Sequence, residues 1–78
     1  MGSRAENERK FLHWSELSAS HRIYRLDLPG RSGWSASYLK EVDAAENTVR
    51  FWQEIYDEKG SLIEIHEKFP VDRGHRKV

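Results

Sequence analysis

The sequence predicts an α+β domain in which an N-terminal helix packs on a four-stranded antiparallel β-meander. Near the N-terminus, apolar residues follow a partial helical stripe, and beyond it they follow a period of two, which is typical of half-buried strands. Short stretches rich in glycine, proline, aspartate and asparagine separate these later segments and favour tight turns. The 78 residues predict one small domain, with flexible tails at 1–7 and 71–78.

The helix is expected at about 8–18. Ser3 and Glu6 have the spacing of a capping box, so a helix can also begin near them. The first ten residues are almost entirely polar, and a frayed tail before a short helix fits them equally well. The apolar side chains that would face the sheet are Phe11, Leu12, Trp14 and Leu17.

Four segments rich in β-branched and aromatic residues are the expected strands. They lie at 22–28, 34–42, 48–56 and 62–69. Asp57 and Gly60 predict a hairpin between the last two, because they suit the start of a type I turn and the following bulge position. Asp43 and Asn47 predict the turn before it. Pro70 ends the last strand, because it cannot donate to a β-ladder.

The lengths of the loops predict a register for the sheet. The expected cross-strand pairs are Ile23 with Leu39, Leu26 with Ala36, Leu39 with Trp52, Val42 with Val49, Trp52 with His66, Ile55 with Ile63, Tyr56 with Leu62, and Arg50 with Lys68. In this register one face is largely apolar and forms the core beneath the helix. The other face is polar except for a row made of Ile23, Leu39, Trp52 and His66. One short helix cannot cover both faces, so part of the second face is expected to be open.

The leading functional hypothesis is a small, non-enzymatic, cytoplasmic binding module that acts through this second face. Contiguous exposed apolar rows usually mark interaction sites, so we expect a protein partner or a homodimer. Trp52 would be the anchor, surrounded by a polar rim. The expected binding residues are Trp52, Leu39, Ile23, Tyr56, Arg50, Lys68 and His66.

A second hypothesis is a single-stranded RNA- or DNA-binding module. Trp52 and Tyr56 offer stacking planes four residues apart on the same face of one strand. The basic side chains on the same face are Arg25, Arg50 and Lys68. Glu41, Glu54 and Glu64 share that face and oppose the binding of phosphates.

A third hypothesis is a metal-independent, toxin-like ribonuclease in which Glu54, His66 and Arg50 act together. A carboxylate base, a histidine acid and an arginine that stabilises phosphate charge suffice for RNA cleavage without a metal. These residue types and their layout on an antiparallel sheet resemble those of small microbial ribonucleases. The expected register also places Glu54 opposite Glu64, which raises the pKa of one carboxyl group. No catalytic residue is assigned beyond these candidates.

Two further resemblances concern shorter features. "YDEKGSLIEI" resembles the hairpins of secreted YD-repeat proteins, in which Tyr-Asp-x-x-Gly begins each turn. A compact sheet followed by terminal histidine and basic residues resembles the nuclease tips of bacterial polymorphic toxins. Neither resemblance assigns a role to any residue.

The composition limits the remaining classes of function. The 13 basic and 13 acidic residues give a formal net charge of zero, which argues against strong nonspecific binding of nucleic acid. Cysteine is absent, and the four histidines lack metal-site spacing, so neither a metal nor another cofactor is expected. No apolar run has the length of a membrane span and no secretory signal is visible, so we expect no membrane association and a cytoplasmic location.

Overall fold

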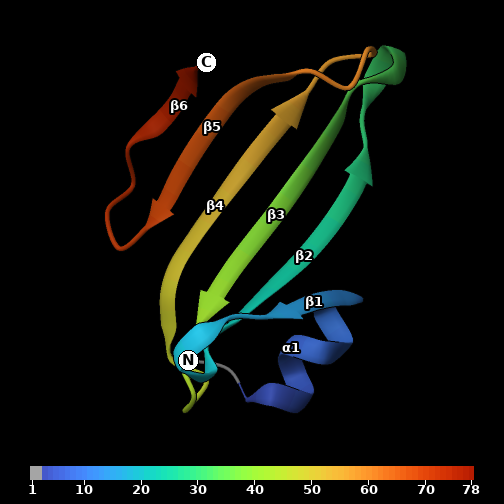
Figure 1. The fold of residues 1–78 in the computed structure, drawn as a ribbon. Helices are drawn as coiled ribbons and strands as arrows, with labels where there is room; N and C mark the ends of the chain where they lie inside the picture. The colour runs from blue at the N-terminus through green and yellow to red at the C-terminus, as the bar shows by residue number, and fades with distance from the viewer. Residues whose placement is uncertain (1–2) are drawn as a thin grey trace.

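A computed structural model describes residues 3–78 and contains one short α-helix and a six-stranded antiparallel sheet (Figure 1). The helix, α1, spans Arg4–Lys10. The strands follow one another in space as they do along the chain: β1 (His13–Glu16), β2 (Arg22–Pro29), β3 (Ser35–Val42), β4 (Thr48–Tyr56), β5 (Leu62–Phe69) and β6 (Gly74–Lys77). The α+β class with an antiparallel meander is therefore confirmed, but the sheet has six strands and not four.

Helix α1 begins at the capping box that the sequence indicates. The Ser3 hydroxyl accepts a hydrogen bond from the Glu6 amide, and the Ser3 amide donates to the Glu6 carboxylate. The helix ends at Lys10 because Phe11 is extended, with φ −108°. The expected helix at about 8–18 is wrong, since residues 13–16 form β1 and pair with β2. Alternation also fits that segment, and it directs Trp14 toward Tyr24, with ring centroids 6.0 Å apart.

Both expected tails contain regular structure. Helix α1 starts within the segment 1–7, whose first two residues lie outside the described part of the chain. Strand β6 lies within the segment 71–78 and pairs with β5, where His75 is opposite His66. Among residues 3–78, no helix is long and apolar enough to cross a membrane.

The register between β2 and β3 differs from the expectation by two residues. Leu26 pairs with Tyr38 and not with Ala36. The connection is longer than expected because a 3-10 turn, η2 (Arg31–Gly33), lies within it, with positive φ at Ser32 and Gly33. A shift of two residues keeps each side chain on its expected face.

The register between β4 and β5 changes at two bulges, and this moves side chains to the opposite face. The irregularities lie between Ile55 and Tyr56 and between Phe51 and Trp52. Tyr56 pairs with Leu62 as expected, and Leu39 pairs with Trp52 across β3 and β4. Four expected pairs are wrong: Ile55 with Ile63, Glu54 with Glu64, Trp52 with His66, and Arg50 with Lys68. A third bulge places Val42 opposite Thr48 instead of Val49.

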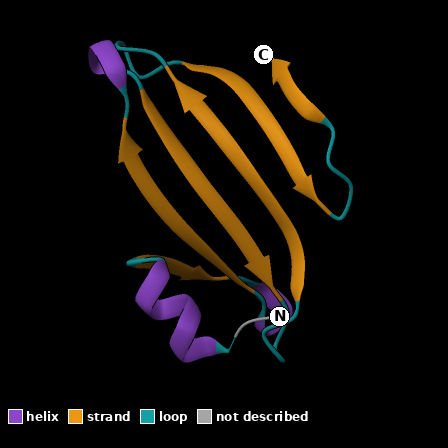
Figure 2. Ribbon diagram, turned by 180° about the vertical axis from the view of Figure 1, so that it is seen from behind, coloured by secondary structure: helices purple, strands orange, loops and turns teal. Residues whose placement is uncertain are grey.

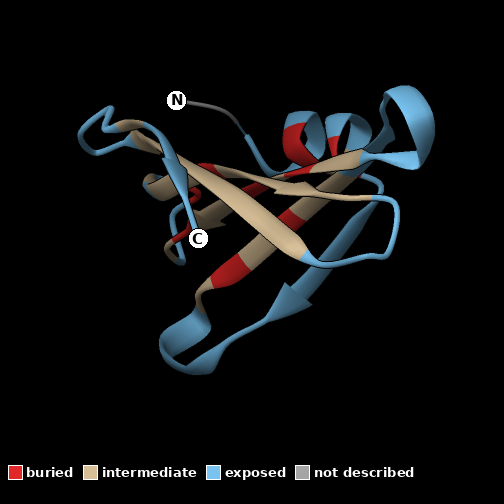
Figure 3. Cartoon of the chain, turned by 90° about the horizontal axis from the view of Figure 1, so that it is seen from above, coloured by how far each residue is buried: buried red, intermediate tan, exposed pale blue. Residues whose placement is uncertain are grey.

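The core lies between α1 and one face of the sheet, which we call the helix-side face. Phe11, Tyr24 and Val42 are fully buried there, and Leu26, Tyr38 and Phe51 pack against them. Helix α1 sits beside β1 at one end of the sheet, so much of the length of β3, β4 and β5 is not covered by it (Figures 1 and 2). Figure 3 shows the result: β5 is of intermediate exposure almost throughout, and β6 is largely exposed.

Arg22 links the helix, β1 and β2 through a largely buried guanidinium. It donates to the Glu8 carboxylate at 2.8 Å and to the Glu16 carboxylate at 2.6 Å. Its Cζ atom lies 5.2 Å from the centroid of the Trp14 ring. A buried arginine requires such partners, because an unpaired charge is costly to desolvate. These contacts of Arg22 therefore hold the helix at this end of the sheet.

Candidate functional site

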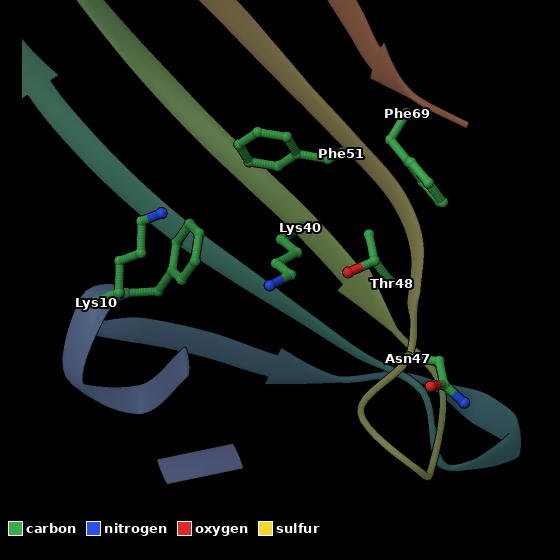
Figure 4. A pocket seen from close by; sticks show the side chains of 7 residues that line it. Lys10, Lys40, Asn47, Thr48, Phe51 and Phe69 are labelled. Carbon is green, nitrogen blue, oxygen red and sulfur yellow. The ribbon is translucent and has the colours of Figure 1, made fainter. Parts of the chain in front are cut away.

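An open groove of about 500 Å³ lies on the helix-side face where α1 meets the sheet (Figure 4). We call it the aromatic–lysine groove. Its lining residues come from the end of α1, from β3, from β4 with the turn before it, and from the end of β5. They are Lys10, Phe11, Lys40, Asn47, Thr48, Phe51 and Phe69.

The register of the sheet brings the groove residues together. Lys40, Phe51 and Phe69 lie opposite one another on three neighbouring strands, so they form one row across the helix-side face. Lys10 is the last residue of α1, and Phe11 follows it as the helix cap, with its ring fully buried. Phe69 is 43% exposed, so one aromatic wall of the groove remains accessible.

A second aromatic row continues from the groove along the strands. Tyr38 stacks on Phe51, with ring centroids 6.3 Å apart and an interplanar angle of 23°. The bulge in β5 leaves Lys68 without a cross-strand partner, and its Nζ atom lies 5.4 Å from the centroid of the Tyr38 ring. Gln53 donates to the Tyr38 hydroxyl at 3.1 Å and holds that ring in place.

The charges that line the groove are not balanced locally. In every described ion pair the cation is an arginine or a histidine, so Lys10, Lys40 and Lys68 take part in none. Lys40 donates to the neutral Asn7 side chain at 3.0 Å. Among residues 3–78, no carboxylate lines the groove. The groove thus combines aromatic rings with lysines that belong to no described ion pair, although the formal net charge of the whole chain is zero.

The opposite face carries Trp52, the residue on which the leading sequence hypothesis depends. Its ring points away from α1, and the side chain is 6% exposed. The guanidinium of Arg50 lies over the indole, with Cζ 4.0 Å from the ring centroid, and the indole N–H donates to Glu54 at 3.1 Å. Leu39, its cross-strand neighbour, is 7% exposed. Trp52 and Leu39 therefore form a small buried cluster beneath charged side chains of their own sheet.

The ion pairs on this face hold that charged cover in position. Arg50 binds the Glu67 carboxylate, and this hydrogen bond holds the pKa of Glu67 below its ordinary value. Arg25 pairs with Asp27 at 2.9 Å. Arg25 and Arg50 each already have an acidic partner, so they contribute little attraction for a phosphate, whereas Arg73 and Arg76 on this face belong to no described ion pair.

Other expected binding residues lie apart from one another. Ile23 is on the Trp52 face, but it pairs with Glu41 and not with Leu39. The Tyr56 hydroxyl donates to Glu54 at 2.6 Å. Lys68 lies on the helix-side face, next to Tyr38.

His66 also lies on the helix-side face. The bulge between Ile55 and Tyr56 shifts the pairing of β5 by one residue, and this moves the side chains of β5 to the opposite face. His66 pairs with Gln53, and its Nε2 atom is 2.7 Å from the Asp72 carboxylate. Its ring packs against that of His75, with centroids 4.4 Å apart. His66 thus joins β5 to the segment that leads into β6.

The residues of the ribonuclease hypothesis are not brought together. Arg50 and Glu54 project from one face, whereas His66 projects from the other, and the backbone of the sheet lies between them. Both oxygens of Glu54 are engaged, one by Trp52 and one by Tyr56. Glu54 lies opposite Ile65, so the expected contact with Glu64 is absent.

The sequence interpretation missed the aromatic–lysine groove because it gave α1 the wrong position. A helix through residue 18 would cover the largely apolar face on which these phenylalanines lie. The basic end of the short helix at Lys10, followed directly by Phe11, is the signal that points to the groove.

Neither comparisons with known proteins nor the placement of potential metal ligands assigns a further role to these residues. A scan against protein-family models finds no match, and searches of the curated proteins and of the solved structures find none either. Within residues 3–78, no group of three or more histidine, aspartate or glutamate side chains is placed to hold a metal ion.

Proposed function

We propose that this chain is a small, non-enzymatic binding module that holds single-stranded nucleic acid on the helix-side face of its sheet. The observation that carries the proposal is the aromatic–lysine groove, where three phenylalanines meet two lysines that form no described ion pair. Modules that bind single strands combine aromatic platforms for the bases with cations for the backbone.

The aromatic rings supply the stacking surfaces. Phe69 is partly exposed at the edge of the groove, and Phe51 continues into the stacked ring of Tyr38. An unpaired base can enter such a groove and present its flat face to a ring, whereas a base inside a duplex is already stacked and paired. The proposal is therefore specific for single strands.

The lysines supply the contacts to phosphate. Lys10 and Lys40 flank the groove, and Lys68 lies beyond it over Tyr38. Because none of these lysines belongs to an ion pair within the described part of the chain, no such pair has to break when a phosphate approaches. This placement is more favourable than that of Arg25 and Arg50 on the Trp52 face, which are already bound to acids.

The test is fluorescence anisotropy with a labelled oligothymidylate of about ten nucleotides at low salt. We expect binding that weakens as salt is raised, and a loss of at least about fivefold in affinity in Phe69→Ala and in Lys10→Gln. Matched controls are Lys59→Gln, at the turn between β4 and β5, and Val49→Ala, which borders a pocket on the Trp52 face. These two variants should bind as the wild type does.

Three outcomes contradict the proposal. The first is the absence of binding at low salt, and the second is an equal loss in the control variants. The third is equal competition by a duplex of the same length or by a polyglutamate peptide, since neither offers unpaired bases. Equal competition by polyglutamate would instead indicate an acidic protein segment as the partner.

The second candidate function is contact with a protein partner, or with a second copy of the chain, through the Trp52 face. The observation that favours it is the partly exposed apolar fringe of Ile23, Tyr56 and Leu62 beside the buried Trp52 cluster. Its test is sedimentation of the wild type and of Ile23→Glu over a range of concentrations. A monomer at every concentration argues against the homodimer.

A further inference from the structure

A second pocket lies at the far end of the helix-side face from the aromatic–lysine groove. It has a volume of about 480 Å³ and is formed by the loop between β2 and β3 together with one position of β4. Its lining residues are Gly30, Arg31, Ser32, Trp34, Ser35, Ala36 and Ile55. We call it the Trp34 pocket.

The Trp34 pocket repeats the chemistry of the groove with different residues. Trp34 is 40% exposed, and its indole N–H donates to the Glu58 carboxylate at 2.7 Å, so the ring is both accessible and held in place. Arg31 is exposed and takes part in no described ion pair or side-chain hydrogen bond. Glu58 is engaged by the indole and does not line the pocket. Of the side chains that the structure describes, Arg31 is the only charged one that lines it.

The loop that carries this pocket packs against the turn between β4 and β5. A Cβ atom added at Gly33 would come within 3.1 Å of the Glu58 side chain, so the loop packs closely on the turn between β4 and β5. The Gly30 amide also donates to the Trp34 carbonyl at 2.6 Å. A ring on a fixed loop loses little conformational entropy when a ligand stacks on it.

The two pockets lie on the same face along the same strands. The pair Ala36–Ile55 borders the Trp34 pocket, and the pair Lys40–Phe51 borders the groove. The four residue steps from Ala36 to Lys40 span about 13 Å at the rise of a β-strand. A stacked strand advances about 3.4 Å per nucleotide, so roughly four steps connect the pockets, and an extended strand needs fewer. The stacked Tyr38 lies between them.

We infer that the Trp34 pocket is a second subsite for the same single strand, so that full affinity requires a stretch of several nucleotides spanning both pockets. This inference rests on the proposed function, because it places the second end of the same ligand. Trp34 stacks on one base and Arg31 binds a phosphate beside it. The groove holds the other end through Phe69 and Lys10.

The test is a length series of oligothymidylates, from two to about eight nucleotides, with binding measured for wild type, Trp34→Ala and Arg31→Gln. We expect wild-type affinity to rise steeply once the strand reaches both pockets. Trp34→Ala should lower affinity about tenfold for the longest strand and leave the dinucleotide unaffected. Trp34→Phe should restore much of the affinity, because it keeps an aromatic plane. Arg31→Gln is an independent check on an exposed loop residue, where the fold is not at risk.

The outcomes separate this inference from the proposed function. If Trp34→Ala and Arg31→Gln bind strands of every length as the wild type does, while Phe69→Ala still weakens binding, the second subsite is wrong and the groove stands. If wild-type affinity does not depend on length, or if Trp34→Ala weakens all lengths equally, the second subsite is also wrong. If no oligonucleotide binds the wild type, the proposed function itself fails.

Discussion

Tyr24 donates its hydroxyl to the Glu46 carboxylate at 2.9 Å and so joins the second strand to the turn that precedes β4. Both side chains are buried. Asn7 of α1 donates to the same carboxylate oxygen at 3.0 Å, and Arg4 donates to the other oxygen at 3.2 Å. One buried carboxylate thus connects the helix to the sheet beside the groove. The backbone of Glu46, which carries it, has a positive φ of 66°.

Removal of the Glu46 carboxylate should destabilise the fold more than its place in a turn suggests. We expect Glu46→Ala to lower the free energy of unfolding by about 2–3 kcal/mol, because the Tyr24 hydroxyl and the Asn7 amide would lose a charged acceptor while buried. The measurement is urea denaturation followed by circular dichroism. Glu64→Ala, which removes a half-exposed carboxylate with no described hydrogen bond, should cost less than about 0.5 kcal/mol. Equal costs in the two variants would contradict the role of Glu46.

The same carboxylate should make stability depend on pH in the acid range. Burial alone would raise the pKa of Glu46, but the hydrogen bonds from Asn7, Tyr24 and Arg4 lower it below its ordinary value of 4.5. The folded state therefore binds the proton less tightly than the unfolded state does. The stabilisation is complete above pH 4.5 and is lost as the pH falls through the lowered pKa of the folded state.

This dependence can be isolated by comparing the wild type with Glu46→Gln, which does not titrate at that position. The difference in the free energy of unfolding between the two proteins should be constant near neutral pH and should shrink below pH 4.5. Other carboxylates whose pKa is lowered, such as Glu67, contribute equally to both proteins and cancel in the difference. A difference that stays constant through the acid range would show that Glu46 does not carry this linkage.

The elements that the sequence predicted well are those bounded by strong turn chemistry. The bounds of β4 and β5 match the prediction at every end, because the side chains of Asp43 and Asp57 accept hydrogen bonds from the backbone of the turns they begin. Local signals of this kind need no knowledge of the rest of the fold.

The features that the sequence did not predict depend on contacts between distant residues. The alternation of apolar residues does not reveal the bulge at Ile55 and Tyr56. Strand β5 alternates regularly, with isoleucines at 63 and 65 and polar residues at 64 and 66, and this pattern is the same whether or not the pairing with β4 is shifted by one residue. The early end of α1 depends on Trp14 packing against Tyr24 as part of a strand. Because of these two errors, the sequence prediction places His66 on the wrong face and does not include the groove. The candidate site was therefore less predictable than the fold.

Trp52 should act mainly as a core residue. Its ring is buried beneath Arg50, so Trp52→Ala removes a large apolar contact and should lower the free energy of unfolding by about 3–5 kcal/mol. For a chain of 78 residues, a loss of this size approaches the whole stability. Trp34→Ala removes a ring of equal size that is 40% exposed, and it should cost about 1 kcal/mol.

Urea denaturation followed by circular dichroism distinguishes the two variants without relying on tryptophan fluorescence. If Trp52→Ala retains nearly full stability and loses a protein partner, the indole is a binding anchor, and the second candidate function gains support.

Salt dependence should distinguish the lysines from the aromatic rings of the groove. For a single strand, the slope of log affinity against log salt concentration is about −0.7 for each phosphate that a cation neutralises. If Lys10, Lys40 and Lys68 each neutralise one phosphate, their joint contribution to the slope is about −2. Each Lys→Gln substitution at these positions should reduce its magnitude by about 0.7, whereas Lys59→Gln should leave it unchanged. Phe69→Ala should weaken binding at every salt concentration and keep the slope, because stacking releases no counterions. A slope that Lys59→Gln reduces as much as Lys10→Gln does would mean that phosphates contact the whole surface and that the groove does not position the strand.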